Sequence, residues 1–152
     1  MPEMKLATLT QSIAEVPAPL HDLMPTGLSL DSRSTENGSV FVALPGFESD
    51  GRDYIDAAFS RGAVAVLAEA EDLESADPRV VPIRGLKTHL GEIARRFYRN
   101  PSNDLSLLAV TGTNGKTSIT DYIGQLLRLL GTPAGTVGTL GARTRAGEAV
   151  GA

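Results

Sequence analysis

Residues 105–131 read LSLLAVTGTNGKTSITDYIGQLLRLLG, and this stretch decides how the rest of the chain is interpreted. The apolar run at 105–110 is typical of a strand that is buried on both faces. A turn rich in threonine and glycine follows it. Apolar residues then recur at the spacing of one helix face, at positions 119, 122, 123, 126, 127 and 130. The stretch therefore predicts a buried strand, a turn and an amphipathic helix.

The predicted turn carries residues suited to holding a phosphate. Backbone N–H groups of a glycine-rich turn and the positive end of the helix dipole can bind this anion. Lys116 would reach the outer phosphates, and a hydroxyl of the next two residues would reach a magnesium ion. The strict phosphate-loop pattern wants glycine where Val110 stands, so an ordinary turn with a solvated Lys116 is the alternative. The candidate phosphate-binding residues are Gly112, Thr113, Asn114, Gly115, Lys116, Thr117 and Ser118, and the candidate magnesium ligand is Thr117 or Ser118.

Length and composition bound the possible classes of protein. The 152 residues suit one domain, or one domain and part of another. The chain has no cysteine, which excludes disulfides and thiolate metal sites, and His21 and His89 lack metal-ligand spacing. A net charge of −4 argues against nucleic acid as a main partner. No segment resembles a secretory signal or is long enough to span a bilayer, so we expect a soluble cytoplasmic protein without membrane insertion.

The residues before 105 predict an α/β unit. We expect a weak lead-in helix within residues 1–24, and an acidic loop at 69–77 that is solvated and holds no metal. Arg95, Arg96 and Arg99 lie mostly on the polar face of a helix and are expected to be solvated. The expected strands are 27–33, 40–44, 63–68 and 79–84, the last near an edge because of Pro82, and the expected helices are 52–61 and 86–98.

A short segment at 100–103, Asn-Pro-Ser-Asn, is typical of a linker. We therefore predict one domain at 1–103 and the beginning of a second at 104–152. After the phosphate-loop helix we expect a glycine-interrupted strand at 133–140 and a polar tail. A complete phosphate-loop domain needs more parallel strands and an acidic residue for magnesium, so we expect the second domain to be incomplete.

Several motifs together resemble the Mur ligases of bacterial peptidoglycan synthesis. These are TGTNGKT at 111–117 and FYRNPS at 97–102. LDSR at 30–33, GSVFVALPG at 38–46 and DGR at 50–52 resemble the amino-terminal domain of the MurE branch, the UDP-N-acetylmuramoyl-tripeptide synthetases. The resemblance implies an α/β fold: a small mixed-sheet uridine-nucleotide-binding domain, then the truncated start of an ATPase-type parallel-sheet domain with a phosphate loop.

The activity that the resemblance implies is ATP- and magnesium-dependent amide-bond ligation. Such an enzyme adds meso-diaminopimelate or L-lysine to UDP-N-acetylmuramoyl-L-alanyl-D-glutamate through an acyl phosphate. The resemblance implies that residues 112–118 bind ATP, with Lys116 as the catalytic residue of the loop and Thr117 as the magnesium ligand. The chain ends before the family's other substrate and magnesium residues, so we expect this segment alone to be inactive. Neither the choice of diamino acid nor the oligomeric state can be predicted from it.

The resemblance also implies contacts to the uridine substrate, at Leu30, Ser32, Phe47, Glu48 and Ser49. From spacing alone, a core Leu30, a turn at Ser32 and a packed Phe47 are equally compatible. Two other functions remain open: a stand-alone module that binds a UDP-sugar peptide without catalysis, and an unrelated phosphate-loop kinase. A full α/β unit before the loop argues against the kinase, because such kinases usually open with the phosphate loop.

Overall fold

The computed structural model describes residues 4–47 and 49–150 of the chain. The chain divides into two compact units, Met1–Leu105 and Ser106–Ala152. The helices are α1 (Leu6–Leu9), α2 (Ile55–Ser60), α3 (Leu86–Phe97) and α4 (Lys116–Leu129), with 3-10 turns at Ala18–Leu20, Ser32–Ser34, Gly51–Tyr54 and Pro101–Asp104. The strands are β1 (Leu28–Ser29), β2 (Val40–Ala43), β3 (Ala65–Glu69), β4 (Val80–Ile83), β5 (Thr136–Gly138), β6 (Gly141–Arg143) and β7 (Ala149–Val150).

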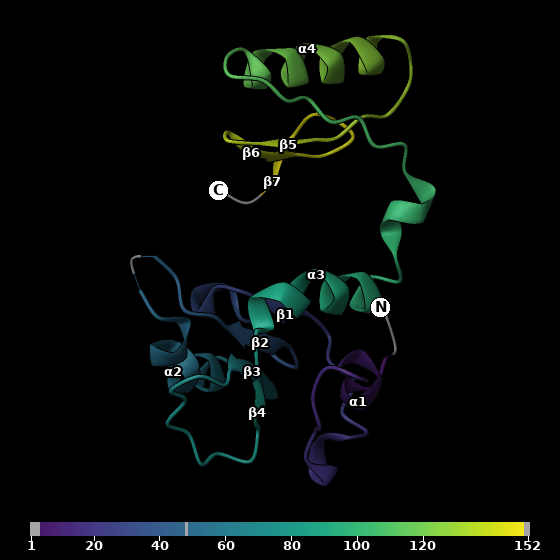
Figure 1. Cartoon of the computed structure of the whole chain (residues 1–152). Helices are drawn as coiled ribbons and strands as arrows, with labels where there is room; N and C mark the ends of the chain where they lie inside the picture. Colours follow the sequence, from purple (N-terminus) through teal and green to yellow (C-terminus); the bar gives the residue numbers. More distant parts are fainter. Residues whose placement is uncertain (1–3, 48, 151–152) are drawn as a thin grey trace. The chain divides into compact units, whose positions relative to one another are not determined.

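The first unit is built on a four-stranded sheet in the order β1-β2-β3-β4 (Figure 1). All three pairings are parallel, so the described strands form a parallel sheet rather than a mixed one. β4 lies at one edge, and its Pro82, which has no N–H to donate, is exposed there. The α/β class expected from the sequence is confirmed.

Side chains that alternate between the two faces of the central strands form two hydrophobic layers. On one face, Val40 and Val42 of β2 pack with α1 and α3, in a cluster that includes Leu6, Ile93 and Phe97. On the other face, the neighbouring β2 residues Phe41 and Ala43 join Ile55 and Ala58 of α2. Successive side chains of a strand point to opposite faces, so a strand between two helical layers must be apolar at every position. The uninterrupted apolar run of β3 at 65–68 follows from its position between the two layers.

Arg96 ties the lead-in segment to α3, contrary to the expectation that it is solvated. Its Nη1 donates to the carbonyl oxygens of Leu9, at 3.1 Å, and Gln11, at 2.7 Å. Its Nε donates to Glu92 Oε1 at 2.7 Å. The last carbonyls of a helix lack partners within that helix, and the guanidinium supplies donors at the end of α1. Arg95 and Arg99 are exposed as expected.

The second unit places α4 against the β5–β6 hairpin (Figure 1). Gly124 is the buried residue of α4, and a Cβ there would lie 2.7 Å from the Thr136 methyl carbon. Arg128 Nη1 donates to the Ala134 carbonyl oxygen at 2.7 Å. β6 also pairs antiparallel with β7, so the expected polar tail contains two strands and the expected strand at 133–140 is shorter. These contacts hold the hairpin in a fixed register along the helix.

The predicted strand at 105–110 is wrong, since these residues form no ladder in the structure. Leu107 is 80% and Leu108 68% exposed. A strand needs a neighbouring strand to receive its backbone hydrogen bonds, and the described strands of this unit pair with one another instead. The segment therefore leads to the candidate phosphate loop without belonging to a sheet.

We find no helix among residues 4–47 and 49–150 with the length and apolarity needed to cross a bilayer.

Candidate functional site

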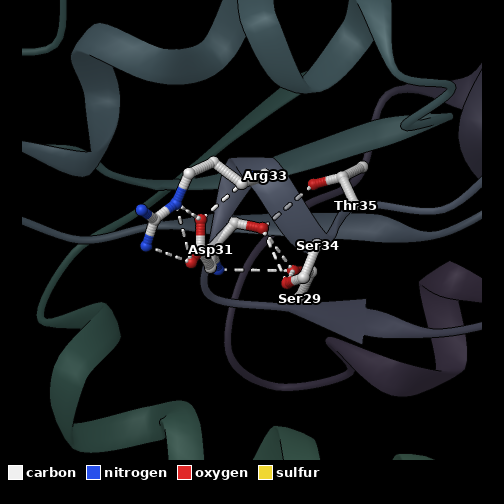
Figure 2. Close-up of polar contacts among 5 residues, drawn as sticks. All are labelled: Ser29, Asp31, Arg33, Ser34 and Thr35. Atoms are coloured by element: carbon white, nitrogen blue, oxygen red, sulfur yellow. Dashed lines mark hydrogen bonds and ion pairs between the residues drawn. The ribbon is translucent and has the colours of Figure 1, made fainter. Parts of the chain in front are cut away.

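The turn after β1 is held by hydroxyl groups that converge on one carbonyl oxygen (Figure 2). The Asp31 carbonyl accepts from Ser29 Oγ at 2.7 Å, Ser34 Oγ at 3.0 Å and Thr35 Oγ1 at 3.4 Å. It also accepts from the Ser34 backbone N–H at 3.1 Å. Short hydroxyl side chains compete with ladder hydrogen bonds in this way. The predicted strand over 27–33 is therefore cut to β1, and Ser32 lies in a 3-10 turn.

The Asp31 side chain closes the same turn through Arg33. It accepts from the Arg33 backbone N–H at 2.9 Å and forms a two-armed ion pair with the guanidinium, with Oδ2 2.8 Å from Nη2. The guanidinium and the backbone N–H together lower the pKa of Asp31 to about 2. The turn buries Ser32 and leaves Leu30 61% exposed. Leu30 is thus available to a ligand, contrary to the alternative that it belongs to the core.

The loop after β2 carries the other candidate substrate residues. Phe47 is fully exposed and Ser49 is exposed, while Glu48 lies outside the described residues. The loop is narrow at its base, because the Gly46 N–H donates to the Ser49 carbonyl at 3.0 Å and the Gly51 N–H to that of Leu44 at 2.9 Å. An exposed phenyl ring excludes the alternative that Phe47 packs under the loop.

Asp50 and Arg52 repeat the pairing of the first turn at the base of this loop. Asp50 accepts from the Arg52 backbone N–H at 2.9 Å, and its Oδ2 lies 2.6 Å from Arg52 Nη2. The Arg52 side chain lowers the pKa of Asp50. Arg52 Nη1 also donates to the Glu71 carbonyl after β3. The DGR motif thus fastens the β2 exit loop to the neighbouring strand connection.

The two turns emerge at one edge of the sheet, because β1 and β2 are parallel neighbours. Ligands of open parallel α/β sheets bind outside the carboxyl ends of the strands. The structure brings Leu30, Ser32, Phe47 and Ser49 to that edge from two separate segments. Their contact with a uridine substrate stays a prediction.

Glu69 occupies the corresponding position at the end of β3, with a role that the sequence did not indicate. Its carboxylate accepts from the backbone N–H groups of Gly85, at 2.9 Å, and Leu86, at 2.8 Å. These are the unpaired donors that begin α3, and Gly85 offers no capping side chain. The sequence signal for such a cap was that the predicted helix at 86–98 begins without Ser, Thr, Asp or Asn at the capping position. Because a carboxylate already fills this helix terminus, the 420 Å³ pocket lined by Glu69 and Arg84 is unsuited to a phosphate there.

The candidate phosphate loop lies in the second unit, directly before α4. Gly112 and Gly115 have φ values of +144° and +75°, in the region that favours glycine. Lys116 begins α4, and its Nζ donates to the loop carbonyls of Gly112 and, at 3.4 Å, Thr113. Residues 111–119, which include Asn114 and Ser118, are exposed. The loop therefore has open backbone, a free helix N-terminus and a cation at one place, which suits the phosphates of ATP.

The Thr117 hydroxyl is the candidate oxygen ligand for a metal ion beside this loop. Its Oγ1 lies 3.1 Å from that of Thr139. The described residues contain no group of three or more His, Cys, Asp or Glu side chains arranged to hold a metal. Magnesium prefers oxygen ligands and usually keeps waters and substrate phosphates in its shell. A threonine hydroxyl in the first turn of α4, directly after the loop, fits that preference as one ligand of the ion.

Comparison with known proteins matches the two parts of the chain to two domains of one family. Residues 25–98 match the family described as "Mur ligase family, catalytic domain", and residues 110–150 match "Mur ligase middle domain". The chain belongs to the Mur ligase family. The UDP-N-acetylmuramoyl-L-alanyl-D-glutamate--2,6-diaminopimelate ligase of Pseudomonas putida is 50% identical over 117 residues, which are 75% of this chain and 24% of that protein. This Mur ligase chain therefore spans about a quarter of the length of the curated relatives it matches.

Solved structures of Mur ligases resemble the chain in fold. A UDP-N-acetylmuramoyl-L-alanyl-D-glutamate--2,6-diaminopimelate ligase matches with a TM-score of 0.69 and 27% identity, over 96% of this chain and 31% of its own. The MurF ligase of Thermotoga maritima, solved in complex with ADP, matches with a TM-score of 0.54 and 32% identity, over 71% of this chain and 24% of its own. The expected resemblance to the family is thus confirmed.

Proposed function

We propose that this chain forms the uridine-nucleotide domain and the phosphate loop of an ATP-dependent ligase of peptidoglycan synthesis. The ligase joins a diamino acid to the D-glutamate of UDP-N-acetylmuramoyl-L-alanyl-D-glutamate. The names of the relatives favour 2,6-diaminopimelate over L-lysine as the added residue. A reaction that uses ATP and a nucleotide-linked precursor also fits the cytoplasm, as does a chain without cysteine.

The observation that carries the proposal is the position of Lys116. It begins α4 behind two glycines with positive φ, in a chain that also presents two closed turns at the carboxyl edge of a parallel sheet. A phosphate loop alone would suit many nucleotide-dependent enzymes. Leu30, Ser32, Phe47 and Ser49, at the carboxyl ends of β1 and β2, form a separate candidate site, the sheet-edge site. Combined with this site, the phosphate loop supports a reaction between a nucleotide-linked substrate and ATP.

The chemistry requires activation of a carboxylate, whose oxygen is a very poor leaving group. The γ-phosphoryl group moves from ATP to the glutamate carboxylate and gives an acyl phosphate and ADP. The amine of the diamino acid then attacks the carbonyl carbon, phosphate leaves, and an amide bond has formed. Lys116 and the N–H groups of the loop hold the phosphates in line and offset their charge. Thr117 would be one ligand of magnesium, which stabilises charge on the transferring phosphate.

Binding measurements on the chain itself test the phosphate loop. We expect calorimetry to detect ADP with magnesium, and Lys116→Ala to weaken it by roughly 10- to 100-fold, as loss of a charged hydrogen bond does. Lys87→Ala is the matched control, since Lys87 is an exposed lysine in the first turn of α3. Equal affinity of the Lys116→Ala and Lys87→Ala proteins would contradict the assignment.

A second titration tests the sheet-edge site with the UDP-N-acetylmuramoyl dipeptide. We expect Ser32→Ala to weaken binding, because Ser32 lies in the turn that faces the ligand edge. Ser60→Ala serves as the control, since its hydroxyl donates within α2 to the Asp56 carbonyl at 2.8 Å. Binding of the uridine ligand without any binding of ADP would favour a non-catalytic binding module instead.

A further inference from the structure

Thr139 lies at the tip of the β5–β6 hairpin and contacts the first turn of α4. Gly138 pairs with Gly141, so residues 139 and 140 form the whole connection between the strands. The Thr139 hydroxyl oxygen lies 3.1 Å from that of Thr117. Both threonines line one pocket of about 190 Å³ that also includes Lys116. The hairpin tip therefore forms a wall of the candidate phosphate site.

Contacts further along α4 keep the tip at this place. Gly124 has no side chain, and the space that a Cβ would enter is filled by the Thr136 methyl group. Arg128 Nη1 holds the Ala134 carbonyl at 2.7 Å. These contacts lie two and three turns after Thr117, at the start of β5. They fix the hairpin along the helix axis, so that its far end meets the helix N-terminus.

The direction of the hydrogen bond follows from the chemistry proposed for Thr117. A hydroxyl that ligates a cation uses an oxygen lone pair and must donate its proton elsewhere. The Thr139 oxygen can accept that proton, which turns the lone pairs of Thr117 away from the hairpin. Groups that orient a ligand of a metal in this way tune its affinity. We infer that Thr139 is a positioning residue, which orients the Thr117 hydroxyl toward the magnesium ion of a bound nucleotide; this rests on the proposed function.

A first experiment measures the orientation of the Thr117 side chain in the absence of any ligand. Three-bond couplings measured by nuclear magnetic resonance report the χ1 rotamer of Thr117 in the free chain. We expect one rotamer to dominate in the wild type and in Thr139→Ser, and averaging among rotamers in Thr139→Val, which keeps the shape but loses the acceptor. Thr132→Val, an exposed position beyond the end of α4, is the control. An unchanged Thr117 rotamer in Thr139→Val overturns the inference.

A second experiment measures how Thr139 affects the contribution of magnesium to ADP binding. ADP affinity is measured by calorimetry with and without magnesium. We expect Thr139→Val to reduce the gain from magnesium by roughly 3- to 10-fold, the range that one neutral hydrogen bond supplies, and to change the affinity for metal-free ADP by less than this factor. Thr139→Ser should restore the gain, and Thr117→Val with Thr139→Val should bind no more weakly than Thr117→Val alone.

The two experiments separate the inference from the function on which it rests. Equal losses with and without magnesium would mean a merely structural role for Thr139 and would overturn the inference. If the wild-type chain binds no ADP, the proposed function fails at this site, while the Thr117 rotamer still decides whether Thr139 positions that side chain.

Discussion

Replacing Gly51 with alanine should destabilise the first unit, because a side chain has no room at this position. A Cβ on residue 51 would lie 2.7 Å from the carbonyl oxygen and 2.8 Å from the backbone nitrogen of Leu44. Both atoms belong to backbone directly after β2, and the Gly51 N–H donates to the same oxygen at 2.9 Å. Relief of the clash must therefore move backbone at the end of a central strand or stretch that hydrogen bond.

The magnitude follows from three terms. Overpacking costs about 1–3 kcal/mol, and a weakened hydrogen bond adds up to ~1 kcal/mol. Alanine lowers the conformational entropy of the unfolded chain, which offsets this loss of stability by about 0.4–1 kcal/mol. The net loss is about 1–3 kcal/mol, and each kcal/mol lowers the melting temperature of a unit of this size by about 4–8 °C.

Gly91→Ala is the matched control for this substitution. Gly91 lies in the middle of α3, and nothing lies within 4 Å of its added Cβ. Because alanine favours a helix over glycine by up to ~1 kcal/mol, this protein should be as stable as the wild type or more so. Amide hydrogen exchange at β3 reads the opening of the first unit separately from the second. A Gly51→Ala protein whose β3 amides exchange no faster than those of the wild type would refute the reasoning.

Two substitutions and one comparison within the wild-type chain test other contacts of the fold. Arg33→Ala should raise the pKa of Asp31 from about 2 toward its ordinary 3.8, as measured by carboxyl chemical shifts. In the wild type, the ion pair with Arg33 should stabilise the turn above about pH 4, and this stabilisation should be lost as pH falls toward 2. Arg96→Ala should speed amide exchange in α1 by roughly tenfold or more, since it removes charged donors from carbonyls at 2.7 and 3.1 Å, whereas Arg95→Ala should not. Helix α4 should exchange faster than β3, because Leu126 and Leu129 are 55% and 85% exposed while residues 65–68 of β3 are buried; equal protection would contradict this.

The sequence predicted the first unit well where local pattern and tertiary packing agree. The strands expected at 40–44 and 63–68 and the helix at 86–98 match β2, β3 and α3 within two residues at each end. Their apolar residues fall at the periods that burial requires, on both faces of a covered strand or on one face of a helix. The glycine-rich turn at 112–115 and the helix that follows it were also predicted from local signals.

Prediction failed where a distant segment decides the structure. Glu69 and Arg96 look like solvated charges in sequence, yet each satisfies backbone groups at a helix end far along the chain. Which charged side chain will cap a given helix depends on the fold and leaves no local pattern. The prediction of a strand over 27–33 was wrong for a local reason. The alternation of Leu and Ser indicated a strand, but the hydroxyls of Ser29, Ser34 and Thr35 stabilise a turn instead.

The run at 105–110 shows the limit of the strongest pattern in the chain. Six residues with four large apolar side chains predict burial, but a hydrophobic pattern specifies only that a surface must be covered and not which surface covers it. A parallel strand obtains its hydrogen bonds from segments far away in sequence, whereas the hairpin of β5 and β6 closes through two residues. In the second unit the local hairpin forms and packs on α4 through Gly124, while Leu107 and Leu108 remain exposed. Antiparallel pairing across a short turn therefore needs only local sequence, and the apolar run before the loop keeps the composition of a buried strand without its partners.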